Sequence, residues 1–579
     1  MFIMTNDKNF VIIDKGSYFI LFENPVFEIE VQNQGKVIEG LKNIEEIVKE
    51  KFYIAGFICY EAGYEIVGLP VKQEKNNIPL LWFGVFTKPK ILEIPKEIEH
   101  NFSISNIRSS LSYDEYIGTI TKIKNYIRDG YTYQANFTFK IFFEFEGDPI
   151  SLFLDLRRKQ LTKYTRFVKY KDTYILSLSP ELFFKISDNT IVTKPMKGTI
   201  RRGRFLEEDK KLSEMLFKSE KDRAENLMII DLLRNDLGIV SEFGSVKVEK
   251  MFEIEKYQTV FQMTSTIVGR IDRSKKFSDI IKSIFPGGSI TGAPKKKTME
   301  ILKELEKYPR GIYTGTIGYI LPNGNSEFNI AIRTPVIQHN KGEIGVGSGI
   351  TWYSEEQKEY KECLLKSSFL ISKPYKEFYL IETMLLKNNK IYLLRYHLKR
   401  LTNSAKYFSF KYSKKAIMEK LIETMKIEGK HKVRLLLKND GNFSIEIHKL
   451  DPKPKNKTIK IAEDRVNSKD IFLYHKTTNR EIYNIYSEKT KEENVLDYVF
   501  LNEKGYVTEG TKHNIIILIE GNLITPKRTS GVLRGTMLEY LSKKYNIKEG
   551  NITLEDLKNS KSIFLCNSVS GIKKVKLIL

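Results

Sequence analysis

The stretch KPMKGT, residues 194–199, places one lysine, Lys197, between a proline turn and a flexible glycine. Glu181, in the run LSPELFF, lies sixteen residues upstream. A buried lysine beside an apolar wall can be neutral and nucleophilic, and a nearby carboxyl group can donate a proton to a leaving group. The pair suggests covalent catalysis, although KPMKGT taken alone is more typical of a structural turn at the end of a strand.

The length and composition of the chain indicate a multidomain globular protein. Its 579 residues exceed what one hydrophobic core usually supports, so we expect two or more domains. No run of eighteen apolar residues predicts a membrane span, and the N-terminus lacks the pattern of a signal peptide. The three cysteines, Cys59, Cys363 and Cys566, have no paired spacing. These features predict a cytoplasmic protein without disulfides and without a membrane partner.

The net charge of +23 raises the question of nucleic-acid binding. The lysines are scattered, with only short clusters such as 295–297, and no nucleic-acid-binding motif accompanies them. A bias toward lysine in the composition, or steering of an anionic substrate, explains the charge more simply. We therefore do not expect a nucleic-acid partner.

The hydrophobic pattern predicts a mixed α+β and α/β fold. Residues up to about 110 alternate as strands around one helix at 37–51, and the mixed region that follows has helical spacing at 113–130 and strand spacing at 133–145. The segment ISKPYK, 371–376, has a proline and no periodicity. We predict domains over 1–372 (an N-terminal part, 1–110, and a catalytic part, 111–372) and 377–579. The second domain has short strands such as KVRLLLK, with helices at 395–408 and 536–545.

Acidic residues recur on two predicted helices of the first domain. Glu225 lies near the start of the run AENLMIIDLLRND, and the run EEQKEYKECLLKS places Glu359, Glu362 and Lys366 on one helical face. Carboxylates that converge from two helices would suit Mg²⁺, which prefers oxygen ligands. The spacing alone favours a solvated face with ion pairs.

Two glycine-rich runs accompany these helices. FPGGSITGAPK, 285–295, and GVGSGI, 345–350, can present backbone N–H groups to an anion. Arg333, in the run AIRT, could add a bidentate contact to a carboxylate. The implied ligand is a small polyanion, and tight turns between strands are an equally good interpretation of the glycines.

Seven runs now stand in order: YQANFT, SPELFF, KPMKGT, ENLMIIDLLRND, FPGGSITGAPK, GVGSGI and EYKECLLKS. This set, over about residues 110–372, resembles the chorismate-utilising enzymes, which implies a large α/β sandwich. Within that family, anthranilate synthase component I usually has alanine where this chain has Lys197, whereas aminodeoxychorismate synthase component I has lysine. The chain therefore resembles the second branch.

The resemblance assigns chemistry to the first domain. It implies that Lys197 adds to C2 of chorismate as the C4 hydroxyl leaves, with Glu181 as general acid. Ammonia would then attack C4 and expel the lysine, which gives 4-amino-4-deoxychorismate. It further implies Mg²⁺ on Glu225 and Glu362, with Glu359 as an acidic neighbour.

The resemblance also implies a set of substrate contacts: Arg333, Gly292, the backbone of Gly347, Ser348 and Gly349, Lys366 and Gln134. Gln134 stands where isochorismate synthases of the family have a lysine that activates water, so its neutrality argues against water as the nucleophile. Gln262 stands where anthranilate synthases commonly have a histidine linked to pyruvate elimination. Its presence favours an aminated product that keeps its enolpyruvyl group.

The second domain has the minimum set of residues for pyridoxal phosphate chemistry. Lys476 lies in YHKTTNREIYN, and Glu509 follows thirty-three residues later in VTEGTKHN. A lysine can form a Schiff base, and an acid can pair with a pyridinium nitrogen. Arg400 and the run SGVLRGT, 530–536, could hold a phosphate. A surface helix residue, for Arg400, and a turn acid, for Glu509, remain alternatives.

This combination resembles the fold class IV pyridoxal-phosphate enzymes, which include aminotransferases and 4-amino-4-deoxychorismate lyase. The resemblance covers about 377–579 and implies a smaller domain of two subdomains, without the GDG-like run that usually opens it. It implies that Lys476 is the Schiff-base lysine and acid–base catalyst, that Glu509 pairs with the pyridine nitrogen, and that Arg400 and Thr536 bind the phosphate. Asn567 and Ser568 are expected close to the cofactor or substrate.

The fusion favours a lyase, because the product predicted for the first domain is a lyase substrate. The chain would then convert chorismate and ammonia to 4-aminobenzoate, a step toward folate. The alternatives are an anthranilate synthase component I fused to a class IV aminotransferase, and a basic nucleic-acid-binding protein. No cysteine lies in the context of a glutaminase nucleophile, so we expect a separate glutamine amidotransferase as partner. Fold class IV enzymes are often homodimers, which suggests a dimer.

Overall fold

The computed structural model describes residues 8–70, 78–95, 100–371, 377–450 and 456–578. The chain divides into two compact units. The first consists of Met1–Arg201 and Glu214–Pro374, and the second of Arg202–Ser213 and Tyr375–Leu579. Residues 372–376 of the predicted boundary segment lie outside the described residues. The grouping of 202–213 with the second unit has no counterpart in the sequence analysis.

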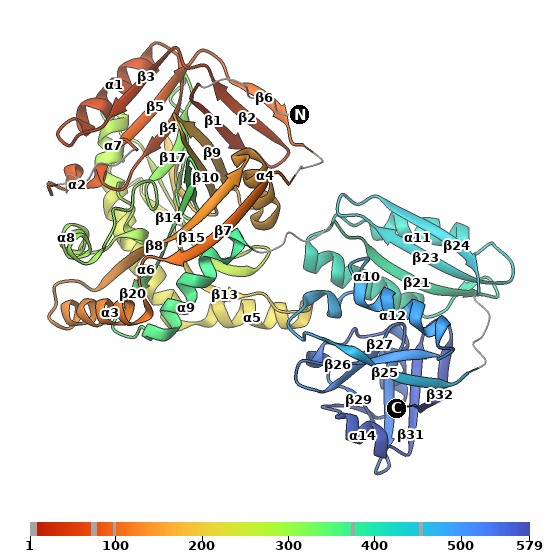
Figure 1. Cartoon of the computed structure of the whole chain (residues 1–579). Coiled ribbons are helices and arrows are strands. Elements are labelled where there is room, and N and C mark those ends of the chain that lie inside the picture. Colours follow the sequence, from red (N-terminus) through yellow and green to blue (C-terminus); the bar gives the residue numbers. More distant parts are fainter. Residues whose placement is uncertain (1–7, 71–77, 96–99, 372–376, 451–455, 579) are drawn as a thin grey trace. The chain divides into compact units, whose positions relative to one another are not determined.

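The first unit contains two ten-stranded sheets, drawn mainly in red to green in Figure 1. One sheet has the order β16-β8-β20-β19-β10-β9-β1-β2-β6, and β7 pairs with β8. Its strands are β1 (Phe10–Asp14), β2 (Tyr18–Glu23), β6 (Lys90–Glu93), β7 (Phe102–Ser109), β8 (Gln134–Gly147), β9 (Tyr164–Tyr170), β10 (Thr173–Ser179), β16 (Gly292–Ala293), β19 (Pro335–Gln338) and β20 (Lys341–Ile350).

The other sheet has the order β13-β15-β12-β11-β18-β17-β4-β5-β3, and β14 pairs with β15. Its strands are β3 (Phe27–Val31), β4 (Tyr53–Ile58), β5 (Leu81–Phe86), β11 (Leu182–Ser187), β12 (Thr190–Lys194), β13 (Met196–Arg201), β14 (Lys247–Lys256), β15 (Val260–Arg270), β17 (Thr316–Ile320) and β18 (Ser326–Ile330).

The two sheets pack face to face as a sandwich. Val11 and Ile13 of one sheet share a buried cluster with Ala55 and Phe57 of the other. Because β1 is buried along its whole length, it reads as a continuous apolar run rather than as an alternation. These buried side chains form the layer between the two sheets and hold the sheets against each other.

Helices cover the outer faces of the sandwich. The outer face of the β8–β20 sheet packs against α3 (Tyr113–Arg128), α4 (Pro149–Gln160) and α9 (Glu356–Ser367). The outer face of the β13–β15 sheet packs against α1 (Val37–Lys49), α6 (Glu220–Gly238) and α7 (Phe277–Ile284). The remaining helices that carry residues of this unit are α2 (Ala62–Ile66), α5 (Leu206–Lys218) and α8 (Lys295–Leu305).

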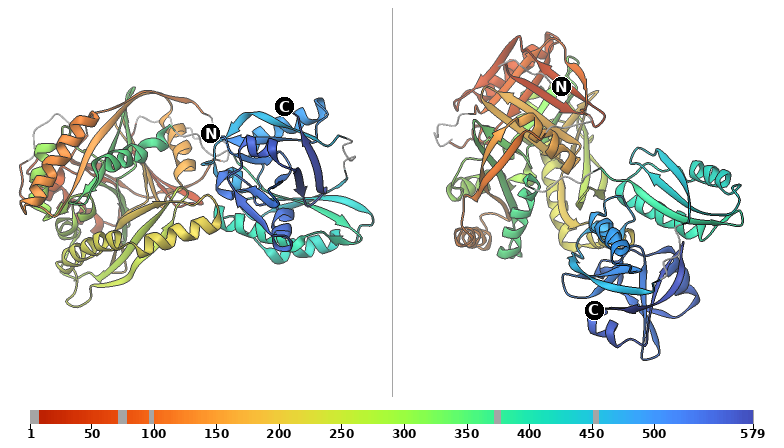
Figure 2. Two further views of the ribbon diagram at one scale, coloured as in Figure 1. Left: turned by 90° about the horizontal axis from the view of Figure 1, so that it is seen from below. Right: turned by 45° about the vertical axis from the view of Figure 1, so that its right-hand side comes forward.

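The second unit has two subdomains, drawn in teal and blue in Figure 1 and Figure 2. A four-stranded sheet, β22-β21-β23-β24, packs against two helices. Its elements are β21 (Leu380–Lys387), β22 (Lys390–Ile391), β23 (Lys430–Leu437), β24 (Phe443–Lys449), α10 (Leu394–Phe408) and α11 (Lys414–Thr424).

The second subdomain is built on an eight-stranded sheet with the order β27-β26-β25-β32-β31-β28-β29-β30. Its strands are β25 (Thr458–Val466), β26 (Asp497–Asn502), β27 (Val507–Gly510), β28 (Asn514–Ile519), β29 (Asn522–Pro526), β30 (Ile547–Gly550), β31 (Ser562–Asn567) and β32 (Gly571–Leu577). Its helices are α12 (Glu481–Glu492), α13 (Thr536–Lys544) and α14 (Leu554–Asn559).

Most predicted elements have close counterparts. The helix predicted at 113–130 is α3, whose first turn is fixed by a capping box between Ser112 and Glu115. The strand predicted at 133–145 is β8, and the second-domain helices predicted at 395–408 and 536–545 are α10 and α13. Lys197 differs from its prediction as a turn residue, because it lies within strand β13.

Candidate active sites

Lys197 is presented by an irregular stretch of β13. The strand pairs Met196 with Thr264 and Thr199 with Gln262 of β15, and its register shifts between these two pairs. Gly198 has a φ of +88°, a conformation that glycine adopts readily and that re-aims the neighbouring side chain. The lysine is therefore placed by a local bulge rather than by regular strand alternation.

The surroundings of Lys197 favour a neutral amine. Burial lowers the pKa of its ammonium group, while the carboxylates of Glu225 and Glu181 act in the opposite direction. Lys366 also lowers it. A neutral Lys197 has a free lone pair, which a nucleophile requires.

Glu181 lies in the same electrostatic environment. It is buried, and its Oε1 accepts a hydrogen bond of 2.9 Å from Ser289 Oγ. Burial raises the pKa of Glu181 to about 7, although Ser289 and Lys197 lower it. This carboxyl group can hold a proton near neutral pH, as a general acid must. Ser289 lies in the glycine-rich run 285–295, but its hydrogen bond to Glu181 was not predicted from the sequence.

Glycine is required at two positions beside Gln134, one of which also lies close to Lys197. A Cβ at Gly349 would lie 2.5 Å from Gln134 Nε2 and 3.4 Å from Lys197 Nζ. A Cβ at Gly292, whose φ is +150°, would lie 2.1 Å from the backbone oxygen of Gln134. The structure thus brings together Lys197, Gln134, Gly349 and Gly292, all of which were predicted for the site.

The side chain of Gln134 has a buried polar atom that is not satisfied within the described part of the chain. Gln134 is buried, and its Oε1 has no hydrogen-bond partner among the described residues. A buried polar atom without a partner is unfavourable unless a ligand or water satisfies it. The amide therefore fits a polar substrate group beside Lys197.

Ser348 and Lys366 have partners within the protein. Ser348 Oγ lies 3.3 Å from Tyr116 Oη, on the face of β20 that packs against α3 and α9. Lys366 Nζ donates to the Gly347 carbonyl at 2.9 Å and pairs with Glu362 at 2.8 Å. Side chains alternate along a strand, so the Ser348 side chain points to the face of the sheet opposite Gly349. Only the backbone of Ser348 is therefore available on the side of Lys197. The predicted contribution of this run is thereby restricted to the main chain.

Arg333 is an anion-binding candidate with a neutral partner. Its Nη1 donates to Gln160 Oε1 at 2.7 Å, and burial lowers the pKa of its guanidinium. Its φ of +50° lies in the left-handed region, which is uncommon for a residue other than glycine. A buried guanidinium that is bonded to an amide suits a carboxylate ligand. No hydrogen bond or ion pair among the described residues connects Arg333 with Lys197.

The predicted magnesium ligands are only partly assembled. Within the described ranges, no group of three His, Cys, Asp or Glu side chains could hold a metal ion, so Glu225, Glu359 and Glu362 do not form a closed site. Glu362 pairs with Lys366, and Glu225 lies 3.9 Å from Lys221. Burial raises the pKa of Glu225, and the charge of Glu359 raises it further. A carboxylate beside another negative charge suits a cation, so an open site on Glu225 and Glu362 fits Mg²⁺, which keeps water and substrate ligands.

Lys476 occupies a fixed position in the second unit. Its carbonyl accepts a hydrogen bond of 2.8 Å from Ile381 N, and Thr477 forms a bridge with Leu380, so β21 holds this segment. Burial lowers the pKa of Lys476 to about 7, and the charges of Arg480 and Arg400 add to this effect. A neutral amine at this pH can react with an aldehyde.

Glu509 is a buried carboxyl group whose direct contacts are neutral. Asn514 Nδ2 donates to its Oε2 at 3.0 Å, and Tyr483 Oη donates to its Oε1 at 3.4 Å. Burial raises the pKa of Glu509 to about 8. A protonated pyridine nitrogen would provide the missing positive charge, so Lys476 and Glu509 together fit pyridoxal phosphate.

The two predicted phosphate contacts belong to one network. Arg400 donates from Nε and Nη2 to Glu382 at 2.9 and 2.6 Å, and His397 Nδ1 lies 2.6 Å from the same carboxylate. Thr536 Oγ1 lies 3.4 Å from His397 Nε2. The network lowers the pKa of Glu382 to about 2 despite its burial. The roles of Glu382 and His397 were not predicted from the sequence. Arg400 uses Nε and Nη2 to bind Glu382, so Nη1 is the guanidinium nitrogen that does not take part in this pair.

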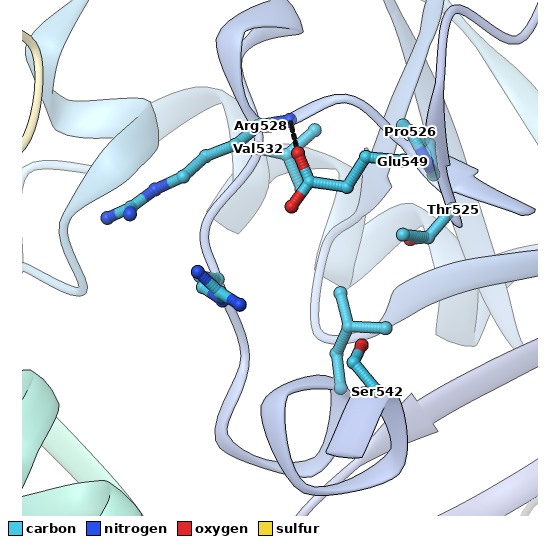
Figure 3. Close-up of a pocket in the computed structure, with 8 residues that line it drawn as sticks. Thr525, Pro526, Arg528, Val532, Ser542 and Glu549 are labelled. Carbon is cyan, nitrogen blue, oxygen red and sulfur yellow. Dashed lines mark hydrogen bonds between the residues drawn. The ribbon is translucent and has the colours of Figure 1, made fainter. Parts of the chain in front are cut away.

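A pocket is lined by the loop that precedes α13 and by residues of β29, β30 and α13. Figure 3 shows residues that line it, among them Thr525, Val532 and Ser542, and the hydrogen bond of 3.2 Å from Arg528 N to Glu549. Its lining includes Val532 and Arg534 of the SGVLRGT run, but not Lys476, Glu509 or Arg400.

No helix in the described part of the chain is long and apolar enough to cross a membrane. Two known families match the chain, one over the part that contains Lys197 and the other over the part that contains Lys476. Residues 7–372 match the family described as chorismate binding enzyme, and residues 379–578 match the family described as amino-transferase class IV.

Individual relatives resemble parts of the chain. The probable aminodeoxychorismate synthase, chloroplastic, of Oryza sativa subsp. japonica is 44% identical over 315 residues, which are 51% of this chain and 35% of the relative. Aminodeoxychorismate synthase component 1 of Escherichia coli (strain K12) is 38% identical over 262 residues, which are 45% of this chain and 58% of the relative. The chain thus spans less than two thirds of either relative.

The crystal structure of anthranilate synthase component I from Streptococcus pneumoniae TIGR4 is similar with a TM-score of 0.55 and 26% identity. The similarity covers 62% of this chain and 92% of that chain. The sandwich of the first unit is therefore the chorismate-binding enzyme fold, and the second unit has the fold of class IV aminotransferases. The match over residues 7–372 covers more than half of this chain, so the chain belongs to the chorismate binding enzyme family.

Proposed function

We propose that the chain makes 4-aminobenzoate from chorismate and ammonia in two steps, amination in the first unit and elimination of pyruvate in the second. One observation carries the first step. Burial lowers the pKa of Lys197 and raises the pKa of Glu181 to about 7, and the two groups interact in one environment, which favours a neutral amine beside a neutral acid. These are the protonation states that addition of the lysine and departure of a hydroxyl group require.

The amination follows from these groups. Lys197 Nζ forms a bond to C2 of chorismate, both ring double bonds shift, and the C4–O bond breaks as Glu181 protonates the leaving oxygen to give water. Ammonia then forms a bond to C4 while both double bonds shift back and the C2–N bond breaks, which frees Lys197. The added lysine and the ammonia each give up one proton; one of these protons restores Glu181, and the other returns to the departing Lys197 amine.

Several residues would bind and orient chorismate. Arg333 and the backbone of the Gly347–Gly349 run would hold its carboxylates, and the unpartnered Gln134 Oε1 would accept a hydrogen bond beside the reacting ring. Glu225 and Glu362 would hold Mg²⁺, which would screen the negative charge of the substrate.

Pyridoxal phosphate, when bound, supplies an electron sink for the second step. Lys476 Nζ removes the proton from the ring carbon that carries the amino group, and its pKa of about 7 makes it an effective base. Glu509 would pair with the protonated pyridine nitrogen. Thr536 and the free side of Arg400 would bind the phosphate. The bond between the ring and the enolpyruvyl oxygen would then break, the departing enolpyruvate would take up a proton to become pyruvate, and the ring would be left as aromatic 4-aminobenzoate.

A glutamine amidotransferase is proposed to supply the ammonia. Cys59, Cys363 and Cys566 are all buried, and burial raises the pKa of each thiol, that of Cys363 to about 11. A glutaminase nucleophile instead requires a reactive thiolate. Free ammonium should replace the partner in the assay. A role in folate biosynthesis, a cytoplasmic location and a homodimer stay predictions.

Two variants test the two steps separately. Lys476→Ala should let 4-amino-4-deoxychorismate accumulate from chorismate, ammonium and Mg²⁺. Lys197→Ala should stop formation of this intermediate or divert the product toward anthranilate. Formation of 4-aminobenzoate at the wild-type rate by either variant would contradict the role proposed for that lysine.

A further inference from the structure

A short segment of the first domain's sequence belongs structurally to the second unit. Arg202–Ser213 groups with Tyr375–Leu579, although the residues on either side of it belong to the first unit. This segment, called the insert below, begins directly after β13, the strand that carries Lys197. Its contacts with the second unit are extensive, and they lead to Lys476.

The first residues of the insert form a turn around Asp209. Arg202 donates to both carboxylate oxygens of Asp209, at 2.7 Å each, and Gly203 N donates to Oδ1 at 2.9 Å. Both side chains are buried. A Cβ at Gly203 would lie 2.2 Å from Asp209 N, so the turn closes tightly. The insert therefore has a defined shape of its own.

Tyr407, at the end of α10, docks this turn. Its Oη donates to the Gly203 carbonyl at 2.6 Å, and its own carbonyl accepts from Arg202 Nη2 at 3.1 Å. The Arg202 guanidinium lies 4.6 Å from the centre of the Tyr407 ring. Tyr407 thus contacts the insert through its hydroxyl group, its ring and its backbone.

A second set of contacts joins the insert to the loop before α13. Arg204 Nη1 donates to the Thr529 carbonyl at 3.0 Å, and Arg528 pairs with Glu207 at 3.1 Å. The Arg528 guanidinium also lies 3.8 Å from the centre of the Phe205 ring. Figure 3 shows this side chain extending away from Glu549, which binds only the Arg528 backbone.

His475, the residue before Lys476, connects the insert with the candidate cofactor site. Its Nε2 lies 3.1 Å from the Arg204 carbonyl, and its Nδ1 lies 2.9 Å from Ser404 Oγ. A carbonyl can only accept, so Nε2 carries the proton and donates, while Nδ1 accepts from the serine. Burial lowers the pKa of His475 to about 3, so the ring stays neutral in this tautomer.

We propose that the insert is a positioning element for Lys476, acting through the hydrogen bond from His475 to the Arg204 carbonyl and through the docking of Tyr407. This inference rests on the proposed pyridoxal phosphate site. The backbone of Lys476 is held on one side by β21 and is preceded on the other by a histidine whose ring is fixed by the insert. Residues encoded between Lys197 and α6 thus hold the residue that precedes Lys476.

The test uses the full-length chain loaded with pyridoxal phosphate. Tyr407→Phe removes the bond to Gly203 and keeps the aromatic ring, and Asp209→Asn weakens the turn of the insert. Tyr412→Phe is the matched control, because its hydroxyl accepts from Thr402 at 3.0 Å and does not bond to the insert. The readouts are the dissociation of pyridoxal phosphate and the pH dependence of the absorbance of the lysine-bound cofactor.

We expect Tyr407→Phe and Asp209→Asn to weaken retention of pyridoxal phosphate by about fivefold, the effect of one buried hydrogen bond. We also expect both to shift the pH midpoint of the absorbance, whereas Tyr412→Phe and the rate of chorismate amination stay at wild-type values. A purely structural role would lower thermal stability without moving the midpoint. Wild-type retention and midpoint in both insert variants would overturn the proposal.

Two substitutions of His475 separate positioning from misfolding. His475→Gln keeps an N–H donor for the Arg204 carbonyl and should stay close to wild type in both readouts. His475→Phe keeps the aromatic packing but loses the donor, and should behave like Tyr407→Phe. Equal behaviour of the two variants would also overturn the proposal. Failure of the wild-type chain to bind pyridoxal phosphate covalently would instead contradict the proposed cofactor.

Discussion

Lys476 should destabilise the cofactor-free protein at neutral pH. Its pKa falls from an ordinary 10.5 to about 7, chiefly because burial removes water from the ammonium group. A shift of one pKa unit corresponds to about 1.4 kcal/mol, so this shift corresponds to about 4 to 5 kcal/mol when the amine is protonated in the unfolded chain. Lys476→Met keeps the apolar stem and removes the titrating amine. The variant should therefore be the more stable protein at pH 7.

The sign of the pH dependence follows from the two pKa values. Between pH 7 and 10.5 the unfolded state binds more protons at Lys476 than the folded state, so the stability of the wild type rises with pH in this window. The stability difference between Lys476→Met and wild type should accordingly fall from about 4 kcal/mol at pH 7 to about 2 kcal/mol at pH 9. At higher pH it should approach zero.

The measurement is denaturant unfolding of the cofactor-free full-length chain at both pH values. The unfolding transition of the second unit is identified as the one that pyridoxal phosphate shifts to higher denaturant concentration. The exposed Lys469 provides a control, since Lys469→Met should change stability by less than about 0.5 kcal/mol at either pH. A Lys476→Met difference that is the same at pH 7 and pH 9 would refute a lowered pKa.

Three further predictions concern the first unit. Glu181→Gln should slow amination by about 10²- to 10⁴-fold. The wild-type rate should fall above pH 7 as Glu181 loses its proton. If the rate of the variant falls in the same pH range, the titrating group is a residue other than Glu181. Gly349→Ala places a Cβ 2.5 Å from Gln134 Nε2 and should raise the KM for chorismate by about tenfold, whereas Gly118→Ala, in open space, should leave it unchanged. Glu362→Gln should raise the Mg²⁺ concentration needed for half-maximal amination without changing the rate of 4-aminobenzoate formation from 4-amino-4-deoxychorismate.

The sequence predicted elements better than it predicted partners. The helical spacing at 113–130 and the alternation after 133 correspond to α3 and β8, because each pattern records which face of its own element is buried. The approach of Gly349 to Lys197 was also anticipated, since the glycine-rich run and KPMKGT were assigned to one site. These features depend on local sequence or on motifs that resemble a known family.

Long-range pairs could not be read from the sequence. Ser289 bonds to Glu181 across 108 residues, and the strand and helix positions of Glu382 and His397 do not by themselves reveal that both serve Arg400. Such pairs are set by sheet order and helix packing, which periodicity does not determine. The insert is a further example, because its buried contacts are with residues about 200 to 325 positions away.

We propose that Lys197 directs chorismate to amination at C4 and that the second unit then removes pyruvate. The most direct measurement is to identify the aromatic product that the full-length chain forms from chorismate, ammonium, Mg²⁺ and pyridoxal phosphate. We expect 4-aminobenzoate, and we expect 4-amino-4-deoxychorismate to accumulate when pyridoxal phosphate is withheld. Anthranilate as the only aromatic product would refute the role proposed for Lys197.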